Sequence, residues 1–283
     1  MFSPDDFKLS FSTVAAPTLT IPQLAELAKT SGYSGVELVM AAGEEDTKAH
    51  GIELDAPPAR IAEARQALAD VAIEVSCIST PLTFGLGAEE SIVDELKRYV
   101  TLAETLSCKT VRVFGSSLSP EHGEVAGLVD AIADSLADAV SYAEKTNTSI
   151  LLETCGDFGT TKYAREVVKQ VYSDHFGILW DVANTCRSLE TIEEAYDNLS
   201  GQVKHVHVCD FQYADGQMKT QDVELGKGEV SYSSAIKYLA HDGYEGFLSV
   251  NTGMEPAEDV LPQYAQVLHQ LVGDAFPEPV ETE

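Results

Sequence analysis

The sequence predicts an α/β protein that folds as a single domain, a closed (β/α)8 barrel. Eight short runs rich in Val, Ile, Leu and Phe alternate with amphipathic stretches, and no segment is left over. The length of 283 residues suits eight such units. The turn after the first run also lacks the glycine pattern of an open, nucleotide-binding sheet. These three observations favour the closed barrel.

The eight apolar runs are predicted to be parallel strands with both faces buried. Each run is short and is bounded by glycine, asparagine or charged residues, which is typical of such strands. In chain order, we expect strands at Lys8–Val14, Gly35–Met40, Ile73–Thr80, Thr110–Gly115, Ser149–Cys155, Gly177–Ala183, Val203–Asp210 and Gly246–Thr252.

The stretches between the strands carry apolar residues at helical spacing. The first helix is predicted to begin after Thr20, which can cap a helix N-terminus, with Pro22 in the first turn. The barrel would span residues 1–272, followed by an acidic, flexible tail over residues 273–283. Helices are expected at Ile21–Ser31, Pro58–Asp70, Glu90–Ser107, Glu124–Thr146, Lys162–Tyr172, Ile192–Leu199, Ser231–Asp242 and Ala257–Leu271.

The loop after the first strand decides between a barrel and an open sheet. A dinucleotide-binding sheet commonly carries a glycine-rich first turn, whereas residues 12–17 read Ser-Thr-Val-Ala-Ala-Pro. The sequence also contains neither a Walker A motif nor a GxSxG nucleophile elbow. The closed barrel is therefore the better prediction.

Acidic residues outnumber basic ones by 46 to 18, which gives a formal net charge of −28 at pH 7. Such a surface repels phosphate backbones and anionic lipid headgroups, so no binding to nucleic acid or membranes is expected. The five cysteines include no CxxC pair and lie mostly in apolar runs, which indicates reduced thiols. Acids stand near the N-terminus where a signal peptide has cations, so we expect a cytoplasmic protein.

The inward faces of the last four strands carry polar residues near the strand ends, where barrel active sites lie. A lone carboxylate there is usually a helix cap or a surface ion pair, but matching positions on consecutive strands favour a shared site. Two carboxylates, an imidazole and an amide oxygen suit one divalent cation, Mn²⁺ first, with Mg²⁺, Co²⁺ or Zn²⁺ as alternatives. The predicted ligands are Glu153, Asp181, His207 and Asn251.

Four segments in the second half of the chain carry a recurring pattern. They read LLETCGDFGT, ILWDVANT, VKHVHVCD and ELGKGEVSYSSAIKYLAHDGYEGFLSVN, and weaker matches occur at GYSGVELV and KTVRVFG. This pattern resembles the xylose isomerase-like TIM barrels, which include sugar phosphate isomerases and epimerases, inosose isomerase and dehydratase, and endonuclease IV. The resemblance implies a metal held by Glu, Asp, His and Glu on strands five to eight. It thus places ligands at Glu153, Asp181 and His207.

The fourth ligand position departs from the family pattern. Family members usually end strand eight with Ser-Val-Glu, whereas this chain has Ser-Val-Asn, ending at Asn251. An amide offers an oxygen ligand but takes up no proton near neutral pH. Since the family's epimerases use two glutamates to remove and return a proton, Glu153 alone remains as an enolising base. We expect His50 as the second acid/base, with Glu229 and Glu255 as alternatives.

Further polar residues fit the binding of a polyol. Glu37 and Arg112 face inward on the second and fourth strands, and their alternative role is a buried ion pair of the barrel core. Asn184 and Arg187 follow the sixth strand, where Arg187 is placed to hold a carboxylate, a phosphate or a hydroxyl. The alternative for Arg187 is a solvated loop charge, and the alternative for His50 is a structural role.

The resemblance and the site residues together predict a divalent-metal-dependent isomerase or epimerase acting on a sugar or cyclitol. The metal would stabilise the enediolate formed when Glu153 removes the proton next to a carbonyl. A lyase or dehydratase that expels a β-substituent from the same intermediate is the first alternative, and Asn251 favours it. A carbohydrate-binding accessory barrel without catalysis is the second.

An endonuclease IV-like activity is not expected, because the chain is acidic and lacks suitably placed further His and Glu ligands. The predicted partner is a small-molecule carbohydrate or cyclitol. The family resemblance also implies that the chain associates with itself or with a partner subunit.

Overall fold

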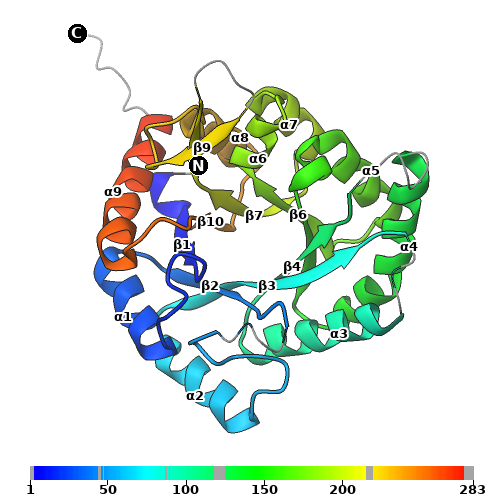
Figure 1. Ribbon diagram of the computed structural model, residues 1–283, viewed down its shortest axis with the longest axis horizontal. Coiled ribbons are helices and arrows are strands. Elements are labelled where there is room, and N and C mark those ends of the chain that lie inside the picture. Colours follow the sequence, from blue (N-terminus) through cyan, green and yellow to red (C-terminus); the bar gives the residue numbers. More distant parts are fainter. Residues whose placement is uncertain are drawn as a thin grey trace.

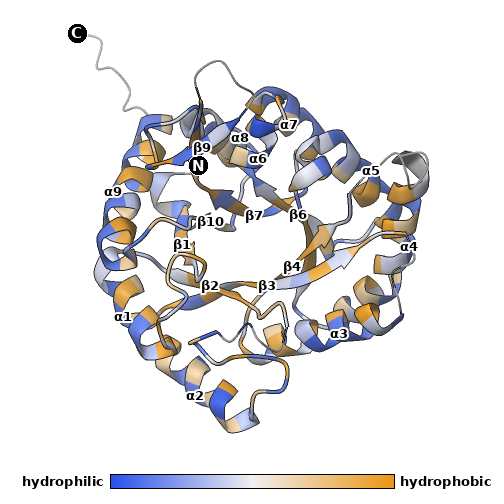
Figure 2. Ribbon diagram, viewed as in Figure 1, coloured by the Kyte–Doolittle hydropathy of each residue, from blue (hydrophilic) through white to orange (hydrophobic). Residues whose placement is uncertain are grey.

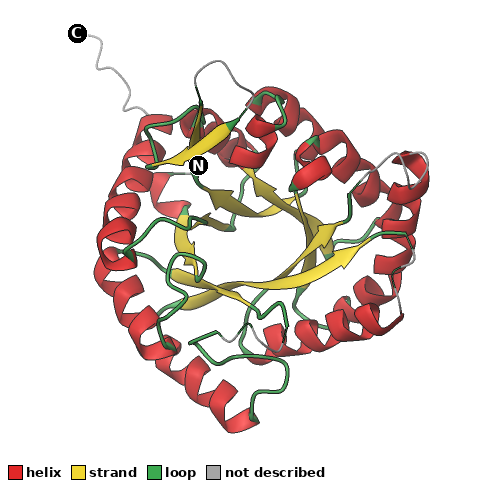
Figure 3. Cartoon of the chain, in the orientation of Figure 1, coloured by secondary structure: helices red, strands yellow, loops and turns green. Residues whose placement is uncertain are grey.

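Eight parallel strands close into a barrel, and helices form a ring around it (Figure 1, Figure 3). The computed structural model describes residues 3–43, 46, 48–86, 88, 90–117, 125–214 and 219–276. The predicted single-domain (β/α)8 barrel is confirmed. The barrel strands are β1 (Lys8–Ser12), β2 (Gly35–Val39), β3 (Glu74–Phe84), β4 (Thr110–Gly115), β5 (Ser149–Glu153), β6 (Phe176–Asp181), β7 (Val203–Val208) and β10 (Phe247–Val250).

Each barrel strand pairs with its neighbours along the chain, and β10 pairs with β1 to close the ring. The register places Asp181 of β6 beside His207 of β7, and His207 beside Ser249 of β10. Because all the strands run in the same direction, their last residues meet at one end of the barrel. The strand pairing therefore brings the predicted site residues to one level.

The ring of helices begins and ends much as the sequence predicts. Thr20 and Gln23 form a capping box, and Gly32 ends the first helix with a φ of +86°, which favours glycine. The last helix ends at Ala275, beyond the predicted Leu271, and residues 277–283 lie outside the described residues. The helices of the ring are α1 (Ile21–Ser31), α2 (Pro58–Ala69), α3 (Glu90–Thr105), α4 (Val125–Ala143), α5 (Thr161–Val171), α7 (Ile192–Leu199), α8 (Tyr232–His241) and α9 (Ala257–Ala275).

The structure adds short elements that the sequence analysis did not predict. Two 3₁₀ helices, η1 (Pro4–Asp6) and η3 (Gly156–Gly159), precede β1 and follow β5. The helix α6 (Val182–Arg187) begins directly after Asp181. After β7, an antiparallel pair forms from β8 (Asp210–Tyr213) and β9 (Thr220–Val223). All but η1 follow the carboxyl ends of barrel strands, so they build up the end of the barrel that holds the predicted site.

The two faces of the barrel wall differ in polarity. On β1, Leu9 and Phe11 belong to the apolar core, whereas Ser10 and Ser12 are fully buried polar residues. The helices around the barrel carry both hydrophobic and hydrophilic residues (Figure 2), as expected of helices with one face packed on a sheet. On this strand, the apolar side chains thus belong to the hydrophobic core and the alternate side chains are buried and polar.

Among the described residues, no helix is both long enough and apolar enough to cross a membrane.

Candidate metal centre

Three side chains meet at the carboxyl end of the barrel, where β5, β6 and β7 finish. Nδ1 of His207 lies 3.8 Å from Oε1 of Glu153 and 3.9 Å from Oδ2 of Asp181. One ligand atom from each of the three residues lies within 4.8 Å of the other two, and all three residues are buried. The structure therefore brings together the three predicted ligands on which spacing and resemblance agree.

Asn251 lies beside these residues, just after β10. Its Nδ2 atom is 3.2 Å from Nδ1 of His207, and its backbone N–H donates to the carbonyl of Val208. A half-turn of the side-chain amide would present Oδ1 to the same point. The predicted fourth ligand is thus adjacent to the other three.

Asp181 is held in place by its position at the start of α6. Its Oδ1 accepts the backbone N–H of Asn184 at 2.8 Å, so that Asp181 caps the N-terminus of this short helix. The backbone N–H of Asp181 donates to the hydroxyl of Thr154 at 2.8 Å. Oδ2 is thereby left pointing toward His207. In this contact Asn184 uses its backbone N–H to bind Asp181. The sequence had predicted instead that Asn184 would contact the substrate.

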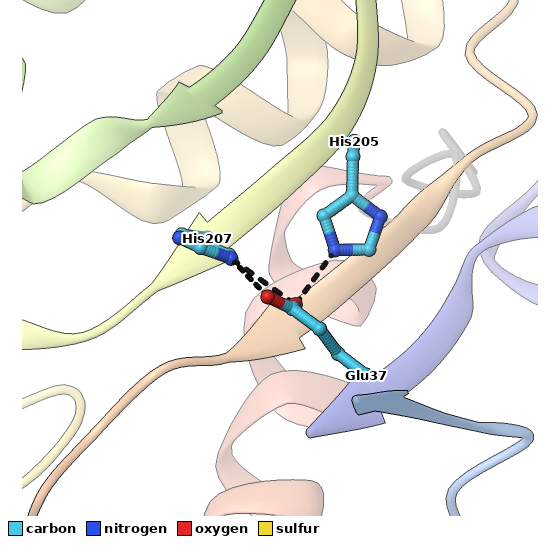
Figure 4. A group of neighbouring side chains, drawn as sticks. All are labelled: Glu37, His205 and His207. Carbon is cyan, nitrogen blue, oxygen red and sulfur yellow. Dashed lines mark hydrogen bonds and ion pairs between the residues drawn. The ribbon is translucent and has the colours of Figure 1, made fainter. Parts of the chain in front are cut away.

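Glu37 lies deeper in the barrel and connects the two histidines of β7 (Figure 4). Nε2 of His207 donates to Oε1 of Glu37 at 2.9 Å, and Nε2 of His205 donates to Oε2 at 3.0 Å. The hydroxyls of Ser79 and Ser249 donate to the same carboxylate, at 2.5 and 2.7 Å. Because Glu37 is fully buried and bonded on both oxygens, these contacts favour a structural role over the predicted substrate contact.

This network determines which nitrogen of His207 faces the ligand carboxylates. A carboxylate accepts hydrogen bonds, so Glu37 holds the proton of His207 on Nε2. Nδ1, the other ring nitrogen, then faces Glu153 and Asp181, and it would offer a lone pair to a cation that displaces its proton. This is the usual arrangement of a metal-binding histidine oriented by a second carboxylate.

Our sequence reasoning assigned no positioning role to Ser79, Ser249 or His205. All three occupy inward positions of their strands. The alternation of inward and outward residues along each strand was the feature of the sequence that could have revealed them. Glu37, His205 and His207 also lie close enough to hold a metal together. We interpret that second group as structural, because the carboxylate of Glu37 already accepts hydrogen bonds from four side chains.

Arg112 forms a buried ion pair, which was the alternative to substrate binding, but its partner is Glu153 and not Glu37. Its Nε atom lies 3.0 Å from Oε2 of Glu153, and its Nη1 donates to the carbonyl of Thr80 at 2.6 Å. Its guanidinium also lies over the ring of Phe114, 3.9 Å from the centroid. Arg112 therefore engages Oε2 of Glu153 and leaves Oε1 facing His207.

His50 is engaged on both ring nitrogens by the backbone of its own region. Nε2 donates to the carbonyl of Val39 at 3.0 Å, and Nδ1 accepts the N–H of Ile52 at 3.1 Å. Burial also lowers the pKa of His50, although the hydrogen bond to Val39 opposes this effect. These contacts favour the structural alternative, and we do not propose His50 as the second acid/base.

Arg187 holds the β8–β9 pair against α6. Nη2 lies 2.6 Å from Oδ1 of Asp222 on β9, and Nη1 donates to the side chain of Asn184 at 3.1 Å. The guanidinium lies over the ring of Phe211, 4.7 Å from its centroid. Arg187 is thus a paired residue, not a solvated loop charge, and it stays a candidate for substrate binding.

Burial and neighbouring charges shift the pKa values of the three ligands. Burial raises the pKa of Asp181 to about 6, although His207 opposes the shift. Burial acts in the same direction on Glu153, but Arg112 and His207 outweigh it and lower the pKa. Burial alone would lower the pKa of His207, yet Glu37 and Glu153 raise it to about 10. The site therefore concentrates negative charge around one imidazole.

These residues fit a divalent cation. Two carboxylate oxygens and a histidine nitrogen converge, and a cation would compensate buried charge that is costly when unpaired. The orientation of His207 by Glu37 adds the second contact that metal-binding histidines normally have. Glu153, Asp181 and His207 would hold such an ion, with the Asn251 amide beside them.

Comparison with known proteins identifies the family of this chain. The family model described as xylose isomerase-like TIM barrel matches residues 25–271. The chain belongs to this family. The resemblance stated from the sequence motifs is thereby confirmed.

A curated relative from the same comparison is 3-oxo-isoapionate decarboxylase of Pectobacterium atrosepticum. It is 26% identical over 159 residues, which are 56% of this chain and 52% of that protein. The match thus spans about half the length of that relative.

Solved structures of xylose isomerase-like barrels share the fold across nearly the whole chain. The probable 3-DHS dehydratase AsbF from Bacillus anthracis has a TM-score of 0.74 and 19% identity, covering 93% of this chain and 98% of that one. The IOLI protein with a bound zinc atom has a TM-score of 0.76 and 18% identity, covering 95% and 99%. At these identities, the similarity establishes the shared fold.

Proposed function

We propose that this protein is a divalent-metal-dependent enzyme that forms an enediolate from an oxo-sugar, an oxo-cyclitol or a related oxo-acid. The observation that carries the proposal is the orientation of His207. Its Nε2 is bound to Glu37, and its Nδ1 faces the carboxylates of Glu153 and Asp181. When bound there, a divalent cation would supply a Lewis acid that polarises a substrate carbonyl.

Glu153 is the residue that would accept the proton next to that carbonyl. Its lowered pKa keeps the carboxylate ionised at neutral pH, and Arg112 fixes the direction of Oε1. A carboxylate of lowered pKa is a weak base, so it suits a carbon acid whose proton is already acidified by a polarised carbonyl. Arg112 acts in this scheme as a positioning residue for the base.

A group that protonates the opposite face of the intermediate is not found among the predicted candidates. Asn251 is an amide, His50 is engaged by the backbone, and Glu229 and Glu255 are exposed. Elimination needs only one base, because the intermediate expels a β-substituent with its bonding electrons and leaves an unsaturated ketone. We therefore propose a lyase as the reaction class. The decarboxylase and dehydratase among the similar proteins support this choice.

Isomerisation is the second candidate, and the single carboxylate base favours it over two-sided epimerisation. Glu153 could take a proton from one carbon and return it to the adjacent carbon on the same face of the substrate. A two-base epimerase, which belonged to our leading prediction from the sequence, lacks its second carboxylate at Asn251.

The test is to supply the purified protein with Mn²⁺, Mg²⁺ or Zn²⁺ and incubate it with oxo-sugars, inososes and oxo-sugar acids in D₂O. A lyase that works by this elimination should release water or an alcohol, whereas an isomerase should incorporate deuterium without losing a group. Glu153→Gln should abolish either reaction. Glu166→Gln, a surface change on α5, is the matched control.

Metal content measured on the same samples tests the accessory-barrel alternative. A folded protein that binds well below one ion per chain, even with added cations, would overturn the proposed enzyme.

A further inference from the structure

A cavity of about 330 Å³ opens at the end of the barrel opposite the metal centre. It is lined by the first residues of six barrel strands, whereas Glu153 and Asp181 are the last residues of theirs. This cavity and the metal centre therefore lie at opposite ends of the barrel. The six first residues are Lys8, Glu74, Thr110, Ser149, Val203 and Phe247.

The charge around this cavity differs from that of the chain as a whole. The sequence has 46 acidic and 18 basic side chains, yet the cavity is lined by three lysines and only two glutamates. Nζ of Lys8 lies 2.9 Å from Oε1 of Glu74 and also lies over the ring of Phe247. Among the described residues, Lys109 and Lys204 have no ion-pair partner. Two ammonium groups are therefore available at this opening.

Lys204 is set in place by a glycine on the neighbouring strand. A Cβ atom at Gly177 would lie 2.8 Å from Cδ of Lys204 and 2.9 Å from its Cε. Any larger residue would thus push the lysine side chain away from β6. The glycine lets the aliphatic part of Lys204 lie against the strand, so that less conformational freedom is lost when its ammonium group binds a ligand.

Ser76 adds a hydrogen-bonding group in the same lining. The residue is only 4% exposed, and its hydroxyl has no hydrogen-bond partner among the described residues. Buried hydroxyls are nearly always hydrogen-bonded, so one without a partner indicates a missing acceptor. Thr110 does not fill this role, because its own hydroxyl donates to the carbonyl of Ser76.

We propose that this cavity is a second ligand site, which binds a small molecule through a phosphate or carboxylate group. Lys109 and Lys204 would neutralise the anion, and the hydroxyl of Ser76 would donate to one of its oxygens. The volume suits a small metabolite, since ligand pockets begin at about 300 Å³. Its position allows occupancy without competition at the metal centre. The proposal is independent of the reaction class proposed above.

The test is calorimetric titration at constant ionic strength with inorganic phosphate and, separately, with succinate. We expect one of the two anions to saturate a single site per chain, which also distinguishes phosphate from carboxylate recognition. The double variant Lys109→Gln/Lys204→Gln should weaken that binding by about tenfold or more, because two charge-assisted contacts are lost. Both lysines are at the surface or half-buried, so the variant should fold.

The matched control is Lys162→Gln/Lys237→Gln, which removes the same charge from helices that do not line the cavity. If this control binds the anion with the affinity of the wild type, the result supports a specific site at the cavity. Equal weakening in both double variants would mean that the anions sense only the general surface charge, and it would overturn the proposal. Failure of both anions to saturate the wild-type protein up to about 20 mM would also overturn it.

Discussion

At the scale of single residues, Glu37 decides how His207 meets a metal ion. Its carboxylate accepts the Nε2–H groups of both histidines of β7, and it is fully buried. A carboxylate in this place does more than satisfy hydrogen bonds. It keeps a proton on Nε2, so that Nδ1, which faces Glu153 and Asp181, is the nitrogen that gives up its proton to a metal ion.

We predict that Glu37→Gln weakens Mn²⁺ binding by about 10- to 100-fold. The amide NH₂ group of glutamine would face an Nε2–H donor, which favours the tautomer that carries the proton on Nδ1. Ser249→Ala is the control, because it removes one hydrogen bond and keeps the carboxylate. Titration calorimetry measures both variants. Wild-type affinity in a folded Glu37→Gln protein would contradict the positioning role.

Asn251 is a second residue whose chemistry can be tested directly. We predict that Asn251→Glu tightens divalent-cation binding by about tenfold, because a fourth site residue would then carry negative charge. Asn251→Ala should bind the ion more weakly than the wild type, since it offers no oxygen. The measurement is the dissociation constant for Mn²⁺ in all three proteins. Identical constants would show that residue 251 does not contact the ion.

The affinity for metal should depend on pH in a defined direction. Because the pKa of His207 is raised to about 10, a cation at Nδ1 must displace a proton, and its affinity rises with pH. The slope should approach about one decade per pH unit at neutral pH. It should steepen below about pH 6, where Asp181 is protonated as well. Dissociation constants that do not change with pH would contradict this assignment.

At the scale of elements, Asp210 organises the segment between β9 and α8. Its carboxylate accepts backbone N–H groups from Phe211, Gly226, Gly228 and Val230. A Cβ atom at Gly228 would lie 2.2 Å from Oδ1 of Asp210, so this position requires glycine. One buried carboxylate thus fixes a segment that would otherwise be an irregular loop.

We predict that Asp210→Asn lowers the free energy of unfolding by about 2–3 kcal/mol, because an NH₂ group would replace an oxygen that faces N–H donors. Amide exchange should also become faster over residues 224–230. Asp222→Asn is the control, since its ion pair with Arg187 is exposed on the Asp222 side and should contribute less than about 1 kcal/mol. Equal losses in the two variants would contradict the special role of Asp210.

At the scale of the whole molecule, the net charge of −28 is the dominant long-range property. Like charges on a compact surface repel one another and destabilise the folded state. We predict that Tm rises by a few degrees from about 0.02 M to about 0.5 M NaCl, as the Debye length falls from roughly 20 Å to roughly 4 Å. Chloride salts suit this measurement, because phosphate would also occupy the proposed anion site. A falling Tm would contradict the prediction.

How much could be predicted depended on the range of the interactions involved. The strands of the barrel and the meeting of Glu153, Asp181 and His207 followed from apolar runs and from the alternation of inward residues. The β8–β9 pair was missed, because its second strand, Thr-Gln-Asp-Val, is short and polar. The sequence left His50 open between a base and a structural residue, because a histidine in a loop gives no sign that the backbone engages both ring nitrogens.

The sequence by itself determined the barrel, the end that holds the site and the three metal-type residues, because these depend on local periodicity and strand direction. Only the tertiary structure decided that Glu37 orients His207, 170 residues away in the chain, and that Arg112 pairs with Glu153. The alternation of residues along a strand predicts that a side chain points into the barrel. It does not predict which side chain of another strand it contacts there. Closure of the ring makes that choice, since it brings distant strands face to face across the interior.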